Sequence, residues 1–479
     1  MLLFSNARKA EAEFADKTRD MARKKTLSPI DSLVEAEPVR EAARALVAAV
    51  QHESANRTLS AKSYDKCIRE LERMRGRPLM MPMLTSGAGK GARVWMADGT
   101  MKLDFIGGIG VYAFGHNDPD LLETAVVAAA SDSVFQGHLM PGPEELRISR
   151  ALLRHAGERM KHVWLSLSGA VANENALKMI FQKHAPADKI VVFEGGFHGR
   201  TMAMAELTDR PAFRDGLPLT GNVLHIPFYN PDDPNSTDQT LQILEGHLKR
   251  FPGQIAGLCA EIIQGEGGFR TAPREFFVAV MGLCKEAGIA VWVDEVQTFV
   301  RTGELFAFRT LELDDYVDIA TAGKLLQGSA TIFTKDYSPR AGLVAGTYAG
   351  STVGMAVGTR IIERLESEGY LGEEGRIVLL GGRIGRRFRS LAKRMPKAIG
   401  PCVGTGAMQA FVPWNGAPEI VKAVVDTAFN EGLILLSAGS NPGKIRMLPP
   451  VNTTDEELEA AFSVLEKSLA HVREEFGLP

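Results

Sequence analysis

From about residue 90 onwards, the chain alternates short apolar runs with longer amphipathic stretches. The apolar runs are rich in valine, isoleucine and leucine, which is typical of strands buried on both faces of a sheet. The amphipathic stretches repeat their apolar positions at helical spacing. This alternation predicts an α/β fold in which helices cover a mainly parallel central sheet. The predicted strands are 163–167, 190–193, 258–263 and 289–293, and the predicted helices are 173–183, 240–251 and 273–287.

The last third of the chain changes to a pattern dominated by helices, which predicts a second, smaller α+β domain. Active sites in α/β folds lie past the carboxyl ends of parallel strands, so polar residues that follow the predicted strands are the first candidates for chemistry. The elements expected in the last third are helices 355–366, 373–395, 419–430 and 456–475 and strand 407–412.

The first 77 residues differ in charge from the rest of the chain. They carry a net charge of +4, whereas the remaining residues carry −7. Within this segment, residues 64–75 place apolar side chains at helical spacing, and the pattern stops at Gly76. We interpret residues 1–77 as an appended helical arm or subunit contact. A regulatory or partner-binding segment is the alternative.

The composition narrows the classes of function. Among 479 residues, 45% are hydrophobic and 24% are charged, as in average globular proteins. The 55 basic and 58 acidic residues nearly cancel to −3, so we expect neither a nucleic-acid nor a membrane partner. No stretch approaches the ~18–20 apolar residues of a membrane helix, and charges from Arg8 onwards interrupt any secretory signal. The sequence therefore predicts a cytoplasmic protein that acts on a small molecule.

The four cysteines lie far apart in the sequence. They form no C-x-x-C pair and have no neighbouring histidines at metal-ligand spacing. We expect reduced, buried thiols and no metal site. The cysteines are Cys67, Cys259, Cys284 and Cys402.

Two strand-like runs end in residues that can carry chemistry. One run ends in Asp294, and thirty residues later another delivers Lys324 beside Gly323. A desolvated lysine amine can attack a carbonyl carbon, and a carboxylate can keep a pyridine nitrogen protonated. Pyridoxal phosphate requires both groups. Ordinary explanations also exist, because Asp294 could cap a helix and Lys324 could be a solvated surface cation.

The phosphate group of such a cofactor needs its own binding site. Residues 166–178 follow a predicted strand and open a helix. Ser168, Gly169 and Ala170 are small enough for backbone N–H groups to approach an anion at the helix N-terminus. A plain strand-to-helix turn would show the same pattern.

Seven motifs follow one another along the chain, namely DFIGGIGVYAFGH at 104–116, FHGRTM at 197–202, EIIQGEGG at 261–268, DEVQ at 294–297 with RTG at 301–303, GK at 323–324, GTYAG at 346–350 and RMLPP at 446–450. With these motifs, the chain from about Gly91 onwards resembles the class III pyridoxal-phosphate-dependent aminotransferases of fold type I. This family includes acetylornithine, ornithine, lysine-ε and 4-aminobutyrate aminotransferases. The resemblance implies a large cofactor-binding domain with a mainly parallel sheet and a smaller α+β domain. We therefore divide the chain into an arm (1–77), the N-terminal part of the small domain (78–114), the large domain (115–354) and the C-terminal small domain (355–479).

The resemblance also implies roles for the cofactor-binding residues. Lys324 would bind the cofactor covalently and then move a proton between the substrate carbon and the cofactor. Asp294 would pair with the pyridinium nitrogen. Gln297 would hydrogen-bond the phenolic oxygen of the ring, and Phe197 would stack on its face. The other implied cofactor contacts are Ser168, Gly169, Ala170, His198 and Thr347.

Among these residues, Thr347 would reach the phosphate of the neighbouring subunit. Gly169 and Ala170 would hold the phosphate of their own subunit through backbone N–H groups. Shared sites of this kind imply an obligate homodimer, in which two equivalent active sites are related by twofold symmetry.

The substrate class is implied by three charged residues. Arg200 would clamp the carboxylate of an ω-amino acid, for which a planar guanidinium is well suited. Glu266 would mask Arg446 while the amino donor is bound and would release it for the α-carboxylate of glutamate. One pocket could then serve both the donor and 2-oxoglutarate. Glu261 could line the site or serve only as a structural acid.

Four departures from the family pattern place the chain off the main branch. Ile109 occupies the position where ornithine-specific members carry a tyrosine, so we expect acetylated ornithine, lysine or a simple ω-amino acid rather than free ornithine. The departures are Val171 for a glutamate, Ile262 for a proline, Leu325–Gln327 for a glycine-rich stretch, and Ser351–Thr352 for an Asn-Pro pair.

Two other functions remain open at this point. The same fold and cofactor also support aminomutases and decarboxylases, which use no external amino acceptor. A non-enzymatic regulator that binds the cofactor is the second alternative. Known regulators of this fold carry a DNA-binding helix-turn-helix, and residues 1–77 show no clear one.

Overall fold

The computed structural model describes residues 36–55, 57–137 and 139–479. Its largest sheet has seven strands in the order β4-β10-β9-β8-β7-β5-β6. Neighbouring strands pair in parallel except at β10, which runs antiparallel to both β4 and β9. The strands are β4 (Met160–Ser166), β5 (Lys189–Phe193), β6 (Val223–Ile226), β7 (Ile255–Ala260), β8 (Ala290–Glu295), β9 (Ile319–Ala322) and β10 (Ser329–Thr334).

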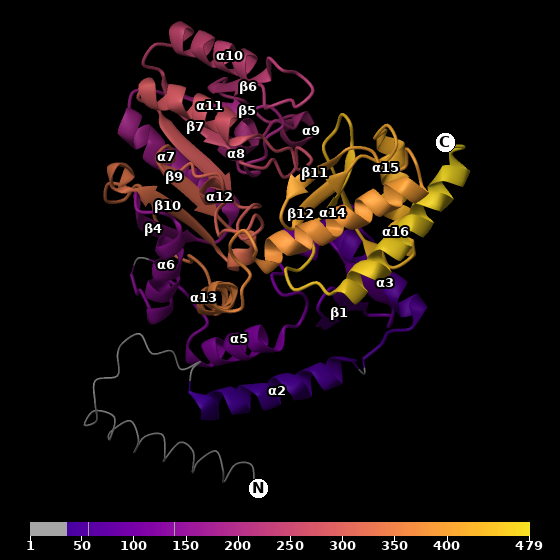
Figure 1. Cartoon of the computed structure of the whole chain (residues 1–479). Helices are drawn as coiled ribbons and strands as arrows, with labels where there is room; N and C mark the ends of the chain where they lie inside the picture. Colours follow the sequence, from indigo (N-terminus) through magenta and orange to yellow (C-terminus); the bar gives the residue numbers. More distant parts are fainter. Residues whose placement is uncertain (1–35, 56, 138) are drawn as a thin grey trace, which may run out of the picture.

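Helices cover both faces of this sheet (Figure 1). The helices of this part of the chain are α6 (Pro143–His155), α7 (Gly169–His184), α8 (Met202–Leu207), α9 (Pro211–Arg214), α10 (Ser236–Arg250), α11 (Arg274–Glu286) and α12 (Ala307–Thr310). Successive strand residues point to opposite faces. In β8, Trp292 therefore packs in one buried cluster with Met179 of α7, whereas Val291 and Val293 pack in another with Val280 of α11.

The second domain combines both ends of the described chain. Strand β13 (Leu433–Ile434) pairs in parallel with β3 (Met101–Asp104), so segments more than 300 residues apart share one sheet. The sheet orders are β1-β2-β3-β13 and β11-β12-β15-β14. The remaining elements are β1 (Thr85–Lys90), β2 (Arg93–Met96), β11 (Cys402–Thr405), β12 (Met408–Phe411), β14 (Leu436–Ala438), β15 (Lys444–Met447), α14 (Arg376–Arg394), α15 (Pro418–Asn430) and α16 (Asp455–Glu475).

The described part of the arm forms α2 (Glu37–Ala55) and α3 (Ala61–Arg75), and α2 lies along α5 (Pro119–Ser131) (Figure 1). Ala43 and Val47 of α2 are buried, and Arg40 forms an ion pair with Asp120 of α5 at 2.8 Å. Asp120 also accepts from Arg360 of α13 (Thr352–Ser367) at 2.7 Å. Helix α13 in turn packs on the turn that follows β9. The first 35 residues of the expected arm lie outside the described residues.

The predicted fold class is confirmed, and the predicted helices and strands are present with small changes at their ends. The predicted strand 258–263 is too long, because β7 ends at Ala260 and the chain then turns. In the ranges that the structure describes, none of the helices has the length and apolar character needed to cross a membrane. The same ranges hold no cluster of metal-ligating side chains.

Candidate active site

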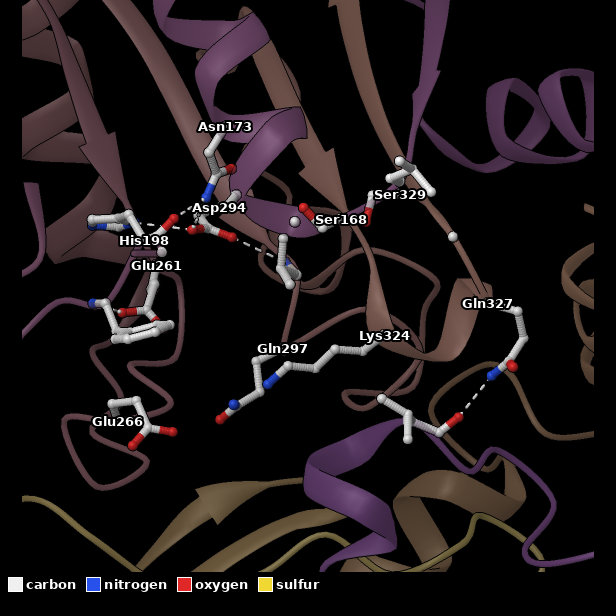
Figure 2. A pocket seen from close by; sticks show the side chains of 18 residues that line it. Ser168, Asn173, His198, Glu261, Glu266, Asp294, Gln297, Lys324, Gln327 and Ser329 are labelled. Atoms are coloured by element: carbon white, nitrogen blue, oxygen red, sulfur yellow. Dashed lines mark hydrogen bonds and ion pairs between the residues drawn. The ribbon is translucent and has the colours of Figure 1, made fainter. Parts of the chain in front are cut away.

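A cavity of about 500 Å³ opens where the carboxyl ends of β8 and β9 meet the N-terminus of α7 (Figure 2). This is the edge of the sheet where α/β folds place their sites. Of the fourteen residues expected to form the site, ten line the cavity. They are Ser168, Gly169, Ala170, Phe197, His198, Glu261, Glu266, Asp294, Gln297 and Lys324.

Asp294 lies near the end of β8 and is only 4% exposed. Its Oδ2 accepts hydrogen bonds from Asn173 Nδ2 at 2.8 Å and from His198 Nδ1 at 2.9 Å. Its Oδ1 accepts from the Val296 N–H at 3.0 Å. Burying a carboxylate is costly unless it is hydrogen-bonded, and three donors satisfy the oxygens of Asp294. The Asp294 side chain is therefore held in one orientation at the wall of the cavity.

His198 lies beside Asp294 and is 2% exposed. Burial by itself lowers the pKa of this imidazole, but the hydrogen bond to Asp294 and its charge outweigh burial and raise the pKa above its usual value. Cys259 Sγ also lies 3.5 Å from His198 Nδ1, and burial raises the pKa of this thiol well above its usual range. His198 is thus well placed to orient Asp294.

Lys324 begins the turn η2 (Lys324–Leu326) directly after β9, and its backbone is left-handed with φ 51°. A left-handed non-glycine residue costs about 1–3 kcal/mol and persists only where its surroundings fix it. Here Gly354 and Gly358 of α13 lie so close to the carbonyl oxygens of Gln327 and Leu326 that a Cβ would not fit. Helix α13 therefore packs closely against the backbone of the turn that contains Lys324.

The side chain of Lys324 extends into the cavity toward Gln297 (Figure 2). Burial, and to a lesser extent the charge of Arg446, lower the pKa of its ammonium group to about 8. At neutral pH, an appreciable fraction of this amine is uncharged and nucleophilic, unlike an ordinary lysine. This environment favours covalent chemistry over a solvated surface cation.

The N-terminus of α7 forms the opposite wall. Ser168 caps the helix by accepting from the Val171 N–H. The N–H groups of Gly169 and Ala170 make no hydrogen bond within the described residues, as expected for the free donors of a first helical turn. A Cβ at Gly169 would lie 2.7 Å from Val296 Cγ1, so only glycine fits here. Two free donors at a positive helix end suit a phosphate group.

Glu261 both lines the cavity and joins two loops. Its Oε1 accepts from the Phe197 N–H at 2.8 Å, and its Oε2 accepts from the Gly265 N–H at 2.9 Å. Burial raises the pKa of this carboxyl to about 7. The two alternatives left open by the sequence are therefore compatible, because one side chain fixes the backbone of Phe197 and also faces the cavity.

The buried side chain of Arg446 and the partly exposed side chain of Glu266 form an ion pair at the edge of the cavity. Arg446 Nη1 lies 2.6 Å from Glu266 Oε1, and Arg446 is only 3% exposed. The pair comes from β15 and from the loop after β7, so the two domains meet here. Arg200 does not line the cavity: its guanidinium is exposed and stacks on the ring of Phe213 at 3.8 Å.

The last two expected site residues also lie outside the cavity walls. Ile109 belongs to a turn beside the cavity, and Gly110 of this turn would bring a Cβ within 3.8 Å of Lys324 Cδ. Thr347 is exposed in the loop before α13. Conversely, Asn173 and Gln327 line the cavity without having been expected. The only sequence signal for Asn173 was an amide near the start of a predicted helix.

The donor set of the cavity fits pyridoxal phosphate. Asp294 offers a fixed carboxylate for a protonated ring nitrogen, and the α7 N-terminus offers free N–H groups for a phosphate. Gln297 Oε1 is buried without a hydrogen-bond partner among the described residues, as expected of a group that serves a bound molecule. Lys324 supplies an amine for the aldehyde. Fold and cavity together define a transferase that depends on pyridoxal phosphate.

Comparison with known proteins identifies the family to which the chain belongs. The family model for class III aminotransferases matches residues 76–469, so the chain belongs to the class III aminotransferase family and is a pyridoxal-phosphate-dependent aminotransferase. It is 30% identical to the acetylornithine aminotransferase of Thermosynechococcus vestitus, over 81% of this chain and 93% of that protein. It is also 30% identical to the 2-aminoadipate transaminase of Pseudomonas putida (81% and 96%) and 32% identical to a probable 4-aminobutyrate aminotransferase of Bacillus subtilis (80% and 92%).

Solved structures confirm the fold. A lysine aminotransferase from M. tuberculosis in its internal aldimine form has a TM-score of 0.75 at 24% identity, covering 84% of this chain and 99% of that one. A Bacillus anthracis aminotransferase has a TM-score of 0.77 at 20% identity, covering 86% and 100%. The predicted family, fold, enzyme class and cofactor are therefore confirmed.

The lowered pKa of Lys324 predicts how cofactor capture depends on pH. The neutral amine is the reactive form, so raising the pH through about 8 should increase the capture rate. We expect the rate at which apoprotein acquires its visible absorption band to rise roughly tenfold from pH 7 to pH 9 and then to level off. A rate that keeps rising in proportion to hydroxide up to pH 10 or beyond would contradict the lowered pKa.

Proposed function

We propose that this enzyme transfers the terminal amino group of an ω-amino acid, of the acetylornithine, lysine or 4-aminobutyrate kind, to 2-oxoglutarate. The products are an aldehyde and L-glutamate. The observation that carries the proposal is the ion pair between the buried guanidinium of Arg446 and the partly exposed carboxylate of Glu266. Opening this pair would leave the buried charge of Arg446 without a partner, and a substrate carboxylate that takes the place of Glu266 would supply one.

The side chains around the cavity have separate roles in the proposed reaction. When bound, pyridoxal phosphate draws electrons from the substrate carbon and carries the amino group between the two substrates. Asp294 holds the proton on the ring nitrogen, and Lys324 moves a proton to and from the substrate carbon. Arg200 would bind the distal carboxylate of the donor after leaving its stack on Phe213, because a guanidinium fork matches a carboxylate.

We further propose that the enzyme works as a homodimer, in which Thr347 serves the phosphate of the partner's site. Large apolar side chains beside this loop are exposed in the single chain, as expected of a surface that another subunit covers. They include Leu139 (68%), Met140 (67%), Leu167 (51%) and Tyr348 (51%). Four free cysteines, two of them buried, support a cytoplasmic location.

The direct test is the visible spectrum of the holoenzyme during successive additions of substrates. L-Glutamate should bleach the cofactor band and release 2-oxoglutarate, and one of a panel of ω-amino donors should bleach it too. Free ornithine should be a poor donor, because apolar Ile109 stands near the cavity. A band that glutamate leaves unchanged would refute the 2-oxoglutarate half-reaction and favour an aminomutase or decarboxylase.

The variant Glu266→Gln separates the two half-reactions. Without the carboxylate that masks Arg446, the ω-amino donor should bleach the band with a KM higher by about tenfold, whereas glutamate should react at least as well as in the wild type. Equal losses with both substrates would show that the pair has only a structural role.

A further inference from the structure

Two turns that contain left-handed residues lie beside the cavity, and one side chain joins them. The first contains Lys324 and ends at Gln327, whose backbone has φ 59° and ψ 19°. The second is α4 (Gly107–Gly110), in which four consecutive residues have φ between 55° and 78°. Gln327 Nε2 donates to the backbone oxygen of Val111 at 2.8 Å, across 216 residues of sequence (Figure 2).

Helix α4 is an unusual conformation for L-amino acids. Left-handed residues normally occur singly, and a β-branched residue such as Ile109 (φ 66°) is a marked outlier there. The buried carboxylate of Asp104 fixes the start of the turn. It accepts from the backbone N–H groups of residues 106–108 at 2.8 to 3.0 Å, and it lies 3.0 Å from His116 Nε2.

Gln327 contacts the end of the turn, which backbone hydrogen bonds from Gly110 and Val111 also close. Val111 lines the cavity, and its carbonyl oxygen accepts the Gln327 side chain. Position 327 itself has a backbone conformation that glycine adopts without strain and that glutamine adopts at some cost. The hydrogen bond to Val111 is exposed, and it is an interaction that glycine at this position could not make.

We propose that Gln327 is a positioning residue that ties the lysine-bearing turn to the 107–111 turn. The tie fixes Ile109 and Val111 relative to Lys324, and therefore fixes the side of the cavity that an amino donor meets. The effect on donor binding rests on the proposed function, whereas the tie itself does not.

The test variant is Gln327→Gly in the holoenzyme. Glycine keeps the left-handed backbone at position 327 without strain and removes the side chain with its donor. Hydrogen exchange of backbone amides in residues 106–112 should accelerate about threefold to tenfold, while Tm stays unchanged or rises. The KM for the active ω-amino donor should rise by about threefold to tenfold with little change in kcat. Exchange and KM equal to those of the wild type would overturn the proposal.

Two further variants separate the tie from backbone effects. Lys397→Gly is the matched control, because Lys397 is exposed, has φ 71° and makes no side-chain hydrogen bond or ion pair in the described ranges. It should leave exchange at 106–112 and donor KM unchanged.

Gln327→Glu keeps the length of the side chain but places an acceptor against the Val111 carbonyl. It should reproduce the faster exchange. If it exchanges like the wild type, glycine flexibility alone explains the first variant, and the tie is refuted.

The readouts distinguish failure of the tie from failure of the proposed function. If exchange accelerates but no ω-amino donor bleaches the cofactor band, the positioning role of Gln327 is supported and the proposed substrate class is refuted. If an ω-amino donor reacts but Gln327→Gly behaves like the wild type, the substrate class is supported and the positioning role is refuted.

Discussion

Replacing Lys324 by alanine is expected to lower the rate of transamination at least about a thousandfold. The amine that bonds the cofactor and the base that moves the substrate proton are the same group, so one substitution removes both contributions. Burial already holds the pKa of this amine at about 8, and the other residues that line the cavity include no second lysine. The measurement is single-turnover bleaching of the cofactor band with L-glutamate.

The matched control for this prediction is Lys335→Ala, because Lys335 is an exposed lysine that also begins a short 3-10 turn, η3 (Lys335–Tyr337). It should keep full activity. A Lys324→Ala protein that retains more than about one-hundredth of wild-type turnover would assign the proton transfer to another group.

Asp294→Asn is expected to give the second largest effect, a loss of about 100-fold to 1,000-fold in kcat with cofactor still bound. The amide keeps the shape of the carboxylate but cannot hold a proton on the ring nitrogen. Its NH₂ group would also face the donors of Asn173 or His198, which now point at a carboxylate oxygen. The measurement is kcat together with the absorption maximum of the bound cofactor.

The neighbouring carboxylate provides a control in the same strand. Glu295 is buried but does not line the cavity, and its oxygens accept from Phe308 N–H and Thr298 Oγ1. Glu295→Gln should leave the absorption maximum and the pH profile of kcat unchanged, whatever it does to stability. If Asp294→Asn also left both unchanged, the ring nitrogen would have a different partner.

The sequence predicted those site residues whose chemistry depends on a local pattern. Asp294 and Lys324 follow apolar runs, and parallel strands bring their carboxyl ends to one edge, so their meeting could be foreseen. Gly169 could be predicted in the same way, because it follows an apolar run and begins a helix. Asn173 could not be foreseen, because a buried amide in a helix becomes meaningful only once β8 places a carboxylate beside it.

Contacts between loops that lie far apart in the sequence could not be predicted, for a physical reason. Nothing within a few residues of Gln327 indicates that its side chain reaches Val111, since a hydrogen bond between irregular segments leaves no periodic trace. The stacking of Arg200 on Phe213 is similar, because the motif around Arg200 predicts a role with substrate but not where the guanidinium rests without one. The expected domain boundaries and individual site roles stay predictions.

Helix α13 gives the arm and the reactive lysine a common support. On one side, its Arg360 shares Asp120 with Arg40 of α2. On the other side, its glycines press against the backbone of the turn that carries Lys324. Helix α13 therefore contacts both α2, through the ion pairs at Asp120, and the turn that carries Lys324. An extension that looks like an addition to the enzyme is thus only one helix away from the reactive lysine.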